Sequence, residues 1–231
     1  MNLPLSKRLQ ACCRFVTPGD RVADIGCDHG YLGIHLLREE IAQSVIAADI
    51  NEMPLQSAMR NAQRFGVQNK MTFHLSAGVE NIPMDFDTLV CAGMGADTMI
   101  SILSAAPWLC AERYRLILQC QSKTPVLRQY LSDNGWHINE ETVLRDGRFL
   151  YTVMEVIWGP NHPRLTTGQI YFPPALWVNP SQELPAYYQS IISRLRRAVA
   201  GQKENADPKL LEALDALGKL EPSLQRLKED Q

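Results

Sequence analysis

The chain has 231 residues, of which 45% are hydrophobic, and its formal net charge is −2 at neutral pH. This length and composition fit one large globular domain, or one domain with a small appendage, and supply enough apolar residues for a sizeable core. The near-neutral charge excludes a globally basic surface for nucleic acid, although a local basic patch can still contact phosphates.

The N-terminus and the cysteines indicate where the protein works. The chain begins without an apolar signal core, and no apolar run approaches the roughly 18 residues of a membrane span. The six cysteines include no CxxC pair and fall mostly in apolar stretches, as buried free thiols do in a reducing compartment. We therefore expect a soluble, cytoplasmic protein with no membrane segment.

Apolar periodicity predicts five alternations of strand and helix. An amphipathic helix over 5–16 precedes a first strand that begins at Val22. Further strands are predicted over 44–49, 70–76, 87–92 and 115–119, and helices over 31–38, 54–65, 97–105 and from Pro125 to Gly135. Pro54 suits the first turn of its helix, and Gly66 is a natural end.

The pattern changes after residue 135. Two strand-like runs over 136–144 and 148–158 meet at Asp146-Gly147, a strong β-hairpin signal. Alternating strands and helices closed by an antiparallel hairpin predict an α/β fold with a doubly wound, mostly parallel sheet.

The stretch from Val22 to Leu32 indicates a buried strand, a tight turn and a helix start. Gly26 gives the backbone freedom to turn, and Gly30 is expected to let a ligand approach the unpaired N–H groups of the helix. A second apolar run ends in Asp49, about 20 residues further on, where a carboxylate can accept both hydroxyls of a ribose. The glycine turn alone could be an ordinary loop, but together these features predict an adenosine-type cofactor.

The C-terminal third is predicted to add two further segments. Residues 161–183 are rich in proline, which prevents a long helix, and we expect an ordered loop packed on the domain by Tyr171, Phe172 and Trp177. Residues 184–231 carry two apolar stripes joined by a turn at 201–207, which predicts an antiparallel, coiled-coil-like helical hairpin.

This hairpin has two possible uses. It could be a stabilising or dimerising appendage, or it could dock RNA through Arg194, Arg196 and Arg197, which lie off the apolar stripe. With residues 1–160 as the cofactor-binding domain, the sequence predicts three segments and a monomer or weak dimer.

Several stretches together resemble one family. Residues 5–9 (LSKRL), 23–32 (ADIGCDHGYL), 92–95 (AGMG), 116–119 (LILQ) and 146–155 (DGRFLYTVME) are similar to the bacterial tRNA (adenine-22-N1)-methyltransferases. The resemblance implies a Rossmann-like class I methyltransferase with a seven-stranded sheet whose last strand is antiparallel. It also implies transfer of a methyl group from S-adenosyl-L-methionine to N1 of adenine 22 in tRNA, which leaves S-adenosyl-L-homocysteine.

The resemblance also implies which residues hold the cofactor over the carboxyl ends of the first strands. They are Asp24, Gly26, Cys27, Asp28, His29, Gly30, Asp49, Ile50, Asn51, Ala77, Gly78, Ala92, Gly93 and Met94. Where the family often has an aspartate in a Gly-Asp-Gly turn, this chain has Ser76-Ala77-Gly78, so the backbone is expected to contact the adenine.

The residues expected to bind tRNA are Lys7, Arg8, Gln119, Arg194, Arg196 and Arg197. Relatives have Pro-Asn after the glutamine, and this chain has Cys120-Gln121 instead, a departure that affects the substrate side.

The predicted chemistry needs positioning and charge stabilisation, since adenine N1 already has a free lone pair. Asp28 is the candidate catalytic carboxylate for the positive charge that develops on the purine, with a turn or cap function as the alternative. His29 could orient Asp28 or the substrate, or merely satisfy backbone groups. Tyr31 could stack on the target base or pack in the core.

The turn after the fourth strand favours a ring nitrogen as the target. Enzymes that methylate adenine N6 usually carry Asn/Asp-Pro-Pro-aromatic there, and the AGMG of residues 92–95 lacks those acceptors. Reaching N1 inside structured RNA requires extrusion of the base, which stacking on the protein can offset.

Other functions fit parts of the sequence. A class I methyltransferase acting on a small molecule or a protein is the main alternative, because fold alone does not choose the substrate. A non-enzymatic RNA- or nucleotide-binding module would keep the same pocket, and a nicotinamide-dependent oxidoreductase is disfavoured by the terminal hairpin. No metal is expected, because four of the histidines lack ligand spacing: His35, His74, His137 and His162.

Overall fold

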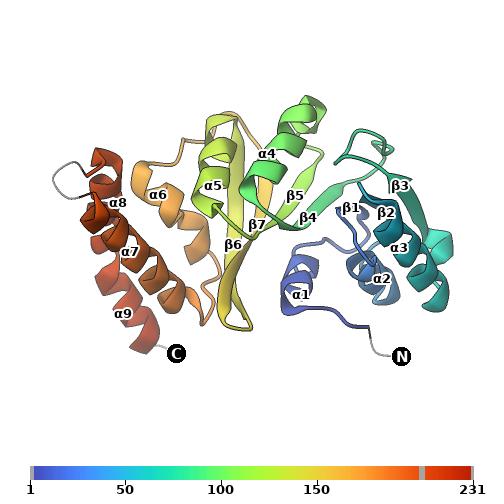
Figure 1. Ribbon diagram of the computed structural model, residues 1–231, viewed down its shortest axis with the longest axis horizontal. Helices are drawn as coiled ribbons and strands as arrows, with labels where there is room; N and C mark the ends of the chain where they lie inside the picture. The colour runs from blue at the N-terminus through green and yellow to red at the C-terminus, as the bar shows by residue number, and fades with distance from the viewer. Residues whose placement is uncertain (1–2, 203–205, 230–231) are drawn as a thin grey trace.

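The computed structural model describes residues 3–202 and 206–229, and these form a seven-stranded sheet in the order β3-β2-β1-β4-β5-β7-β6 (Figure 1). The strands are β1 (Arg21–Ile25), β2 (Ser44–Asp49), β3 (Met71–Leu75), β4 (Thr88–Met94), β5 (Arg115–Cys120), β6 (Trp136–Asp146) and β7 (Phe149–Trp158). The first five pair in parallel, and β7 pairs antiparallel with both β5 and β6. The predicted α/β sheet with a closing hairpin is confirmed.

Helices bury both faces of the sheet. They are α1 (Lys7–Cys13), α2 (Tyr31–Arg38) and α3 (Glu52–Arg64) on one face, and α4 (Ala96–Ala105) and α5 (Thr124–Asp133) on the other. Val22 and Val45 join the first cluster, whereas their neighbours Ala23 and Ile46 join the second. Neighbouring residues on a strand point to opposite faces, so uninterrupted apolar runs are needed to fill two cores.

Some boundaries differ from the prediction. Helix α1 is shorter than residues 5–16, because the Ser6 side chain caps it by accepting a hydrogen bond from the Leu9 N–H. In the β6–β7 hairpin Asp146 pairs with Phe149, so the two central residues are Gly147 and Arg148 rather than Asp146 and Gly147. Gly147 has a φ of +59°, the conformation that a type II′ turn needs at its first central position. Single-turn helices η1 (Gln68–Lys70) and η2 (Pro107–Leu109) complete the connections.

The proline-rich segment contains helix, so the prediction of a loop was wrong there. It forms α6 (Thr167–Tyr171) and η3 (Pro174–Trp177). A capping box starts α6, in which the side chains of Thr166 and Gln169 bond each other's backbone. The expected anchoring is present, since buried Phe172 packs edge-on against Trp177 and Tyr188.

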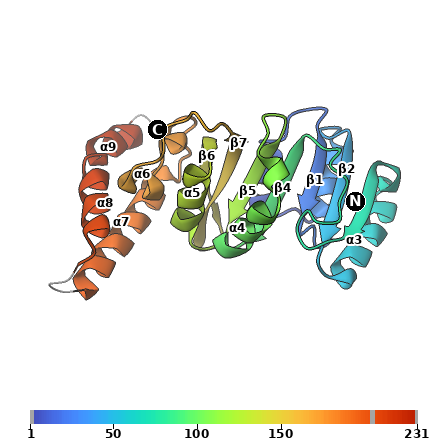
Figure 2. The same ribbon diagram turned by 90° about the horizontal axis from the view of Figure 1, so that it is seen from above.

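The C-terminal segment forms α7 (Leu184–Gly201), α8 (Pro208–Gly218) and α9 (Glu221–Glu229) beside β6, at the opposite end of the sheet from β3 (Figures 1 and 2). The predicted second helix is split, because Pro222 lacks an N–H and fits only the first turn of a new helix. The predicted turn at 201–207 lies partly outside the described residues.

The leucine stripe of α8 and α9 packs within the same chain. Leu217 and Leu224 are buried with Tyr188 and Ile191 of α7, and the Tyr188 hydroxyl donates to the Leu217 carbonyl at 2.9 Å. This packing favours the interpretation of the hairpin as a stabilising appendage.

A buried ion pair joins the C-terminal segment to the sheet. Arg128 of α5 and Glu141 of β6 are fully buried and bond bidentately at 2.6 and 3.1 Å. The same guanidinium donates to the carbonyls of Ile170 and Tyr171 and to the Tyr187 hydroxyl. All five of its N–H groups therefore have partners, which come from three other elements, β6, α6 and α7.

Breaking this pair should strongly destabilise the protein. We expect Arg128→Met to lower the free energy of unfolding by about 3–5 kcal/mol, because Glu141 would keep an uncompensated buried charge. The matched control is Lys219→Ala, which removes the exposed pair with Asp215 and should cost at most about 1 kcal/mol. Urea denaturation of the three proteins measures both effects, and equal losses would contradict this account.

Candidate active site

The candidate site lies at the carboxyl edge of the sheet, where β1 stands between β2 and β4. The chain runs outward from this point in both directions, so the loops after β1 and β4 diverge and leave a crevice. Two cavities of about 500 and 390 Å³ lie there and share Gly26 and Met94 as lining residues. Met94 separates them, since its Cε lies 2.4 Å from where a Cβ on Gly26 would be.

The larger cavity brings together most of the predicted catalytic and cofactor-binding residues. From the predictions it contains Arg8, Asp24, Gly26, Cys27, Asp28, His29, Tyr31, Ala92, Gly93, Met94 and Gln119. Sequence reasoning missed the contributions of Pro4, Ser6, Leu9 and Gln121. The first three precede or begin α1, and the LSKRL stretch was the only sequence signal that could have placed them.

The smaller cavity lies beyond the ends of β2 and β3. Besides the shared Gly26 and Met94, five predicted residues line it: Asp49, Ile50, Asn51, Ala77 and Gly78. Polar groups that were not predicted also line it, namely Ser76, Glu80, Thr98 and Ser101. Thr98 and Ser101 lie three residues apart on one face of α4, so their spacing could have identified them once the strand order was known.

Backbone hydrogen bonds hold the turn after β1 against the end of β2. The N–H groups of Gly26 and Cys27 both donate to the Ala48 carbonyl, at 2.8 and 2.9 Å. The Asp28 N–H donates to an Asp49 carboxylate oxygen at 3.1 Å. Asp28 has a φ of +50°, which is uncommon for a residue other than glycine and is tolerated best by Asn and Asp.

Gly30 serves packing rather than ligand approach. It lines neither cavity, and a Cβ at this position would lie 2.9 Å from the Ala58 Cβ of α3. Gly30 is also the N-cap residue of α2, with a φ of +72°. The expectation that Gly30 makes room for a ligand was therefore wrong, because the space its missing side chain leaves is taken by another helix.

Asp24 is a buried carboxylate with an unused oxygen. It lines the larger cavity, and its Oδ2 has no hydrogen-bond partner. Burial raises the pKa of Asp24 to about 7; a hydrogen bond from the Gly33 backbone opposes the rise, and the charge of Asp49 adds to it. An ionised oxygen in such a place is stabilised by a donor or a cation, and a ligand ammonium group would supply both.

Asp49 is preorganised by the backbone around it. One oxygen accepts from the Asn51 N–H at 2.9 Å and the other from Asp28. Each carboxylate oxygen keeps further acceptor capacity, so two ligand hydroxyls can still bind. Cys27 lies nearby, and burial raises the pKa of its thiol, with the charges of Asp24 and Asp49 adding to the effect. That thiol stays protonated and unreactive.

The three predicted catalytic residues meet at the mouth of the larger cavity. His29 Nε2 lies 3.6 Å from Asp28 Oδ1, and the rings of His29 and Tyr31 are 5.6 Å apart at their centres. The Asp28 side chain is 70% exposed and that of His29 is 50% exposed, so neither is committed to the core. This arrangement can place a carboxylate beside a flat ligand.

The predicted substrate-binding residues divide between two distant places. Buried Gln119 lines the larger cavity, but its Oε1 accepts from the Gly93 N–H at 3.0 Å and so holds the irregular end of β4. Arg8 also lines this cavity, whereas Lys7 is exposed and lines neither one. The exposed arginines 194, 196 and 197 belong to α7, at the far end of the molecule (Figure 2).

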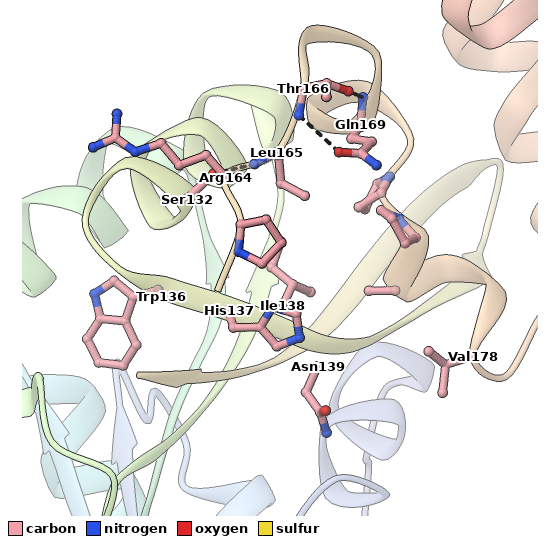
Figure 3. A pocket seen from close by; sticks show the side chains of 14 residues that line it. Ser132, Trp136, His137, Ile138, Asn139, Arg164, Leu165, Thr166, Gln169 and Val178 are labelled. Atoms are coloured by element: carbon pink, nitrogen blue, oxygen red, sulfur yellow. Dashed lines mark hydrogen bonds between the residues drawn. The ribbon is translucent and has the colours of Figure 1, made fainter. Parts of the chain in front are cut away.

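A third cavity, of about 450 Å³, opens at the opposite edge of the sheet (Figure 3). His137 and Asn139, near the start of β6, face Leu165 and Val178 of the connecting segment. Among the described residues that line it, none has a buried polar side-chain atom without a hydrogen-bond partner. No described residue along this cavity therefore offers an unpartnered buried oxygen of the kind that Asp24 has.

The described residues include neither a membrane-spanning helix nor a cluster of metal-binding side chains. Within residues 3–202 and 206–229, no helix is both long and apolar enough to cross a membrane. In the same part of the chain, no three His, Cys, Asp or Glu side chains gather in a way that could hold a metal ion.

Comparisons with known proteins agree with this geometry. The tRNA (adenine(22)-N(1))-methyltransferase of Bacillus subtilis is 31% identical over 154 residues, which cover 66% of this chain and 65% of that enzyme, slightly less than two thirds of its length. A Streptococcus agalactiae protein of the NADB-Rossmann superfamily is 28% identical, with a TM-score of 0.83 over 95% of this chain and 98% of that one.

A second solved structure includes a ligand. It is a Streptococcus pneumoniae protein, provisionally assigned as a tRNA (m1A22) methyltransferase, in complex with S-adenosyl-L-methionine. It is 28% identical, with a TM-score of 0.81 over 94% of this chain and 99% of that one. Residues 5–154 match the methyltransferase domain family, a stretch that contains every lining residue of the two cavities at the carboxyl edge except Pro4, and every strand but the end of β7. The chain therefore belongs to the methyltransferase domain family.

Proposed function

We propose that the chain transfers a methyl group from S-adenosyl-L-methionine to N1 of adenine 22 in tRNA and releases S-adenosyl-L-homocysteine. The observation that carries the proposal is the unpartnered Asp24 oxygen beside a two-part cavity at the point where the strand order reverses. Similarity to the Bacillus subtilis enzyme supports the substrate, and the S-adenosyl-L-methionine complex of the Streptococcus pneumoniae protein supports the methyl donor.

The donor set suits each part of S-adenosyl-L-methionine. Asp24 would bind the ammonium group of the methionine part, and Asp49 would bind the ribose hydroxyls. Ile50 and Ile102 give the smaller cavity apolar surfaces for the adenine ring, and Glu80 is a polar group in place of the family's missing aspartate. When bound, the cofactor supplies an electrophilic methyl group on its sulfonium sulfur.

The mouth of the larger cavity would take the target adenine. Asp28 there would stabilise the positive charge that the ring gains when N1 is methylated, since a fixed carboxylate needs no reorganisation. His29 would orient Asp28, and Tyr31 would stack on the base. A nucleotide of folded tRNA reaches such a cavity only after extrusion from its stack.

The remaining expectations extend this proposal. Residues 1–160 would be the catalytic domain, 161–183 the connecting segment and 184–231 the appendage. The internal packing of Leu217 and Leu224 supports a monomer or weak dimer. A tRNA substrate would place the protein in the cytoplasm.

Nucleoside analysis tests the reaction. We expect tRNA incubated with the protein and S-adenosyl-L-methionine to gain 1-methyladenosine at position 22, as measured by mass spectrometry. Asp28→Ala should lower turnover about 100-fold, the usual cost of losing one preorganised electrostatic group, while cofactor binding is retained. Asp97→Ala, an exposed carboxylate that lines neither cavity, is the control. Methyl transfer only to small molecules or proteins would overturn the function, and full activity of Asp28→Ala would remove Asp28 from the mechanism.

Cofactor affinity should depend on pH through Asp24. Its pKa of about 7 means that the carboxyl is mostly protonated below pH 7 and cannot bind an ammonium group as an ion. We therefore expect calorimetry to show affinity for S-adenosyl-L-methionine rising from pH 6 to pH 8. Asp24→Asn should bind weakly with little pH dependence. Equal pH profiles for the two proteins would contradict the assignment of Asp24.

The stability of the free protein should follow the opposite trend. Because folding raises the Asp24 pKa from 3.8 to about 7, its contribution is fully present below pH 3.8 and is lost as the pH rises to 7. Relative to Asp24→Asn, the wild type should lose at most about 1.4 kcal/mol of unfolding free energy per pH unit across this window. Urea denaturation at several pH values measures the difference, and parallel curves would show that Asp24 does not titrate there.

A further inference from the structure

Two aromatic rings and two guanidinium groups form a row along the β6–β7 hairpin. Arg148 Cζ lies 4.9 Å from the centre of the Phe149 ring, which lies 6.2 Å from the centre of the Tyr151 ring. Arg8 Cζ lies over the Tyr151 ring, 5.0 Å from its centre. Phe149 and Tyr151 are two residues apart on β7, so both side chains stand on the same face of the strand. We call these four residues the hairpin row.

The hairpin row begins at the active site and ends at the hairpin turn. β6 runs in the same direction as β5, so the turn after β6 lies at the same edge of the sheet as the candidate site. Arg8 lines the larger cavity, and its Nε bonds Asp146 at 3.0 Å. Figure 1 shows the hairpin turn next to α1, in line with this ion pair.

The outer half of the row, Phe149 and Arg148, is exposed. Phe149 is 52% exposed, although it follows a turn whose geometry Gly147 already provides. A half-exposed phenyl ring forfeits much of the stabilisation that burial would give. Arg148 is exposed, and no carboxylate among the described residues forms an ion pair with it. One aromatic face and one cation are thus available to a partner.

We propose that the hairpin row is the stacking surface for an unpaired tRNA nucleotide next to the target adenosine. This inference rests on the proposed function. RNA bases stack on aromatic rings and on guanidinium planes, and arginines bond the phosphates between them. Extrusion of the target base leaves its neighbour without a stacking partner, and Phe149 replaces that partner just outside the cavity.

Binding of unmethylated tRNA, measured by fluorescence anisotropy with S-adenosyl-L-homocysteine present, tests the proposal. We expect Phe149→Ala to weaken binding about tenfold, the effect of losing one stacked base. Phe149→Trp should retain binding, whereas Phe149→Leu should lose it, because leucine keeps the apolar surface and lacks the ring. Arg148→Gln should reduce the slope of log K against log salt by about 1, as expected when one phosphate contact is lost.

The matched control is Val126→Ala, which truncates a comparably exposed apolar side chain on α5. It should bind tRNA as the wild type does. All variants should keep the wild-type melting temperature and affinity for S-adenosyl-L-methionine, because Phe149 and Arg148 line neither cavity. Wild-type binding by Phe149→Ala or Phe149→Leu, or no tRNA binding by the wild type, would overturn the proposal.

A methylation assay on the same proteins separates the two proposals. If the wild type binds tRNA in a way that depends on Phe149 but forms no 1-methyladenosine, the proposed function is refuted. The proposal that the hairpin row is a stacking surface for RNA is then supported. If the wild type methylates position 22 and the Phe149→Ala variant has the same KM for tRNA, the proposed function is supported. The proposal that the hairpin row is a stacking surface is then refuted.

Discussion

The active site depends on the hydrogen bonds that fix the turn after β1 to the end of β2. The Ala48 carbonyl accepts from two successive N–H groups, and the Asp49 carboxylate accepts from the Asp28 N–H. These bonds hold three carboxylates, of Asp24, Asp28 and Asp49, around one short turn, although like charges repel. Burial raises the pKa of Asp24, with the charge of Asp49 adding to the rise, whereas the Asp28 side chain stays exposed. One backbone arrangement therefore positions the residues proposed to bind the cofactor and the one proposed to face the target base.

The rest of the molecule supports the sheet that carries this turn. Two cores press on the sheet from both faces, and the Arg128–Glu141 pair joins α5, β6, α6 and α7 at the far end. A buried pair of this kind adds little stability when intact but is costly to break, so it fixes which elements meet. The C-terminal helices are thus firmly attached although they lie far from both cavities at the site.

Local patterns in the sequence were enough to predict the strand and helix order, the closing hairpin and the positions of Asp24, Asp28 and Asp49. The mistakes concern contacts between residues distant in sequence. The sequence around Gly30 suggests a ligand-binding glycine, but a side chain at this position would clash with the Cβ of Ala58. Thr98 and Ser101 of α4 could not be predicted as lining residues either, because that prediction requires knowing that β4 lies beside β1 in the sheet. Helix α6 was missed because proline content outweighed a capping box that the sequence does contain.

The ion pair between Arg8 and Asp146 joins positions that are 138 residues apart. The half of the site that holds Asp24 and Asp49 needs only contacts among β1, β2 and their neighbours. These residues lie near the N-terminus and are close together in the sequence. The opposite wall closes only when the final hairpin has been made and has met the first helix, a contact of high loop-closure cost. During synthesis, the turn that carries Asp28 can therefore meet Asp49 well before Arg8 can meet Asp146, so a chain cut short before the hairpin would keep the first contact and lack the second.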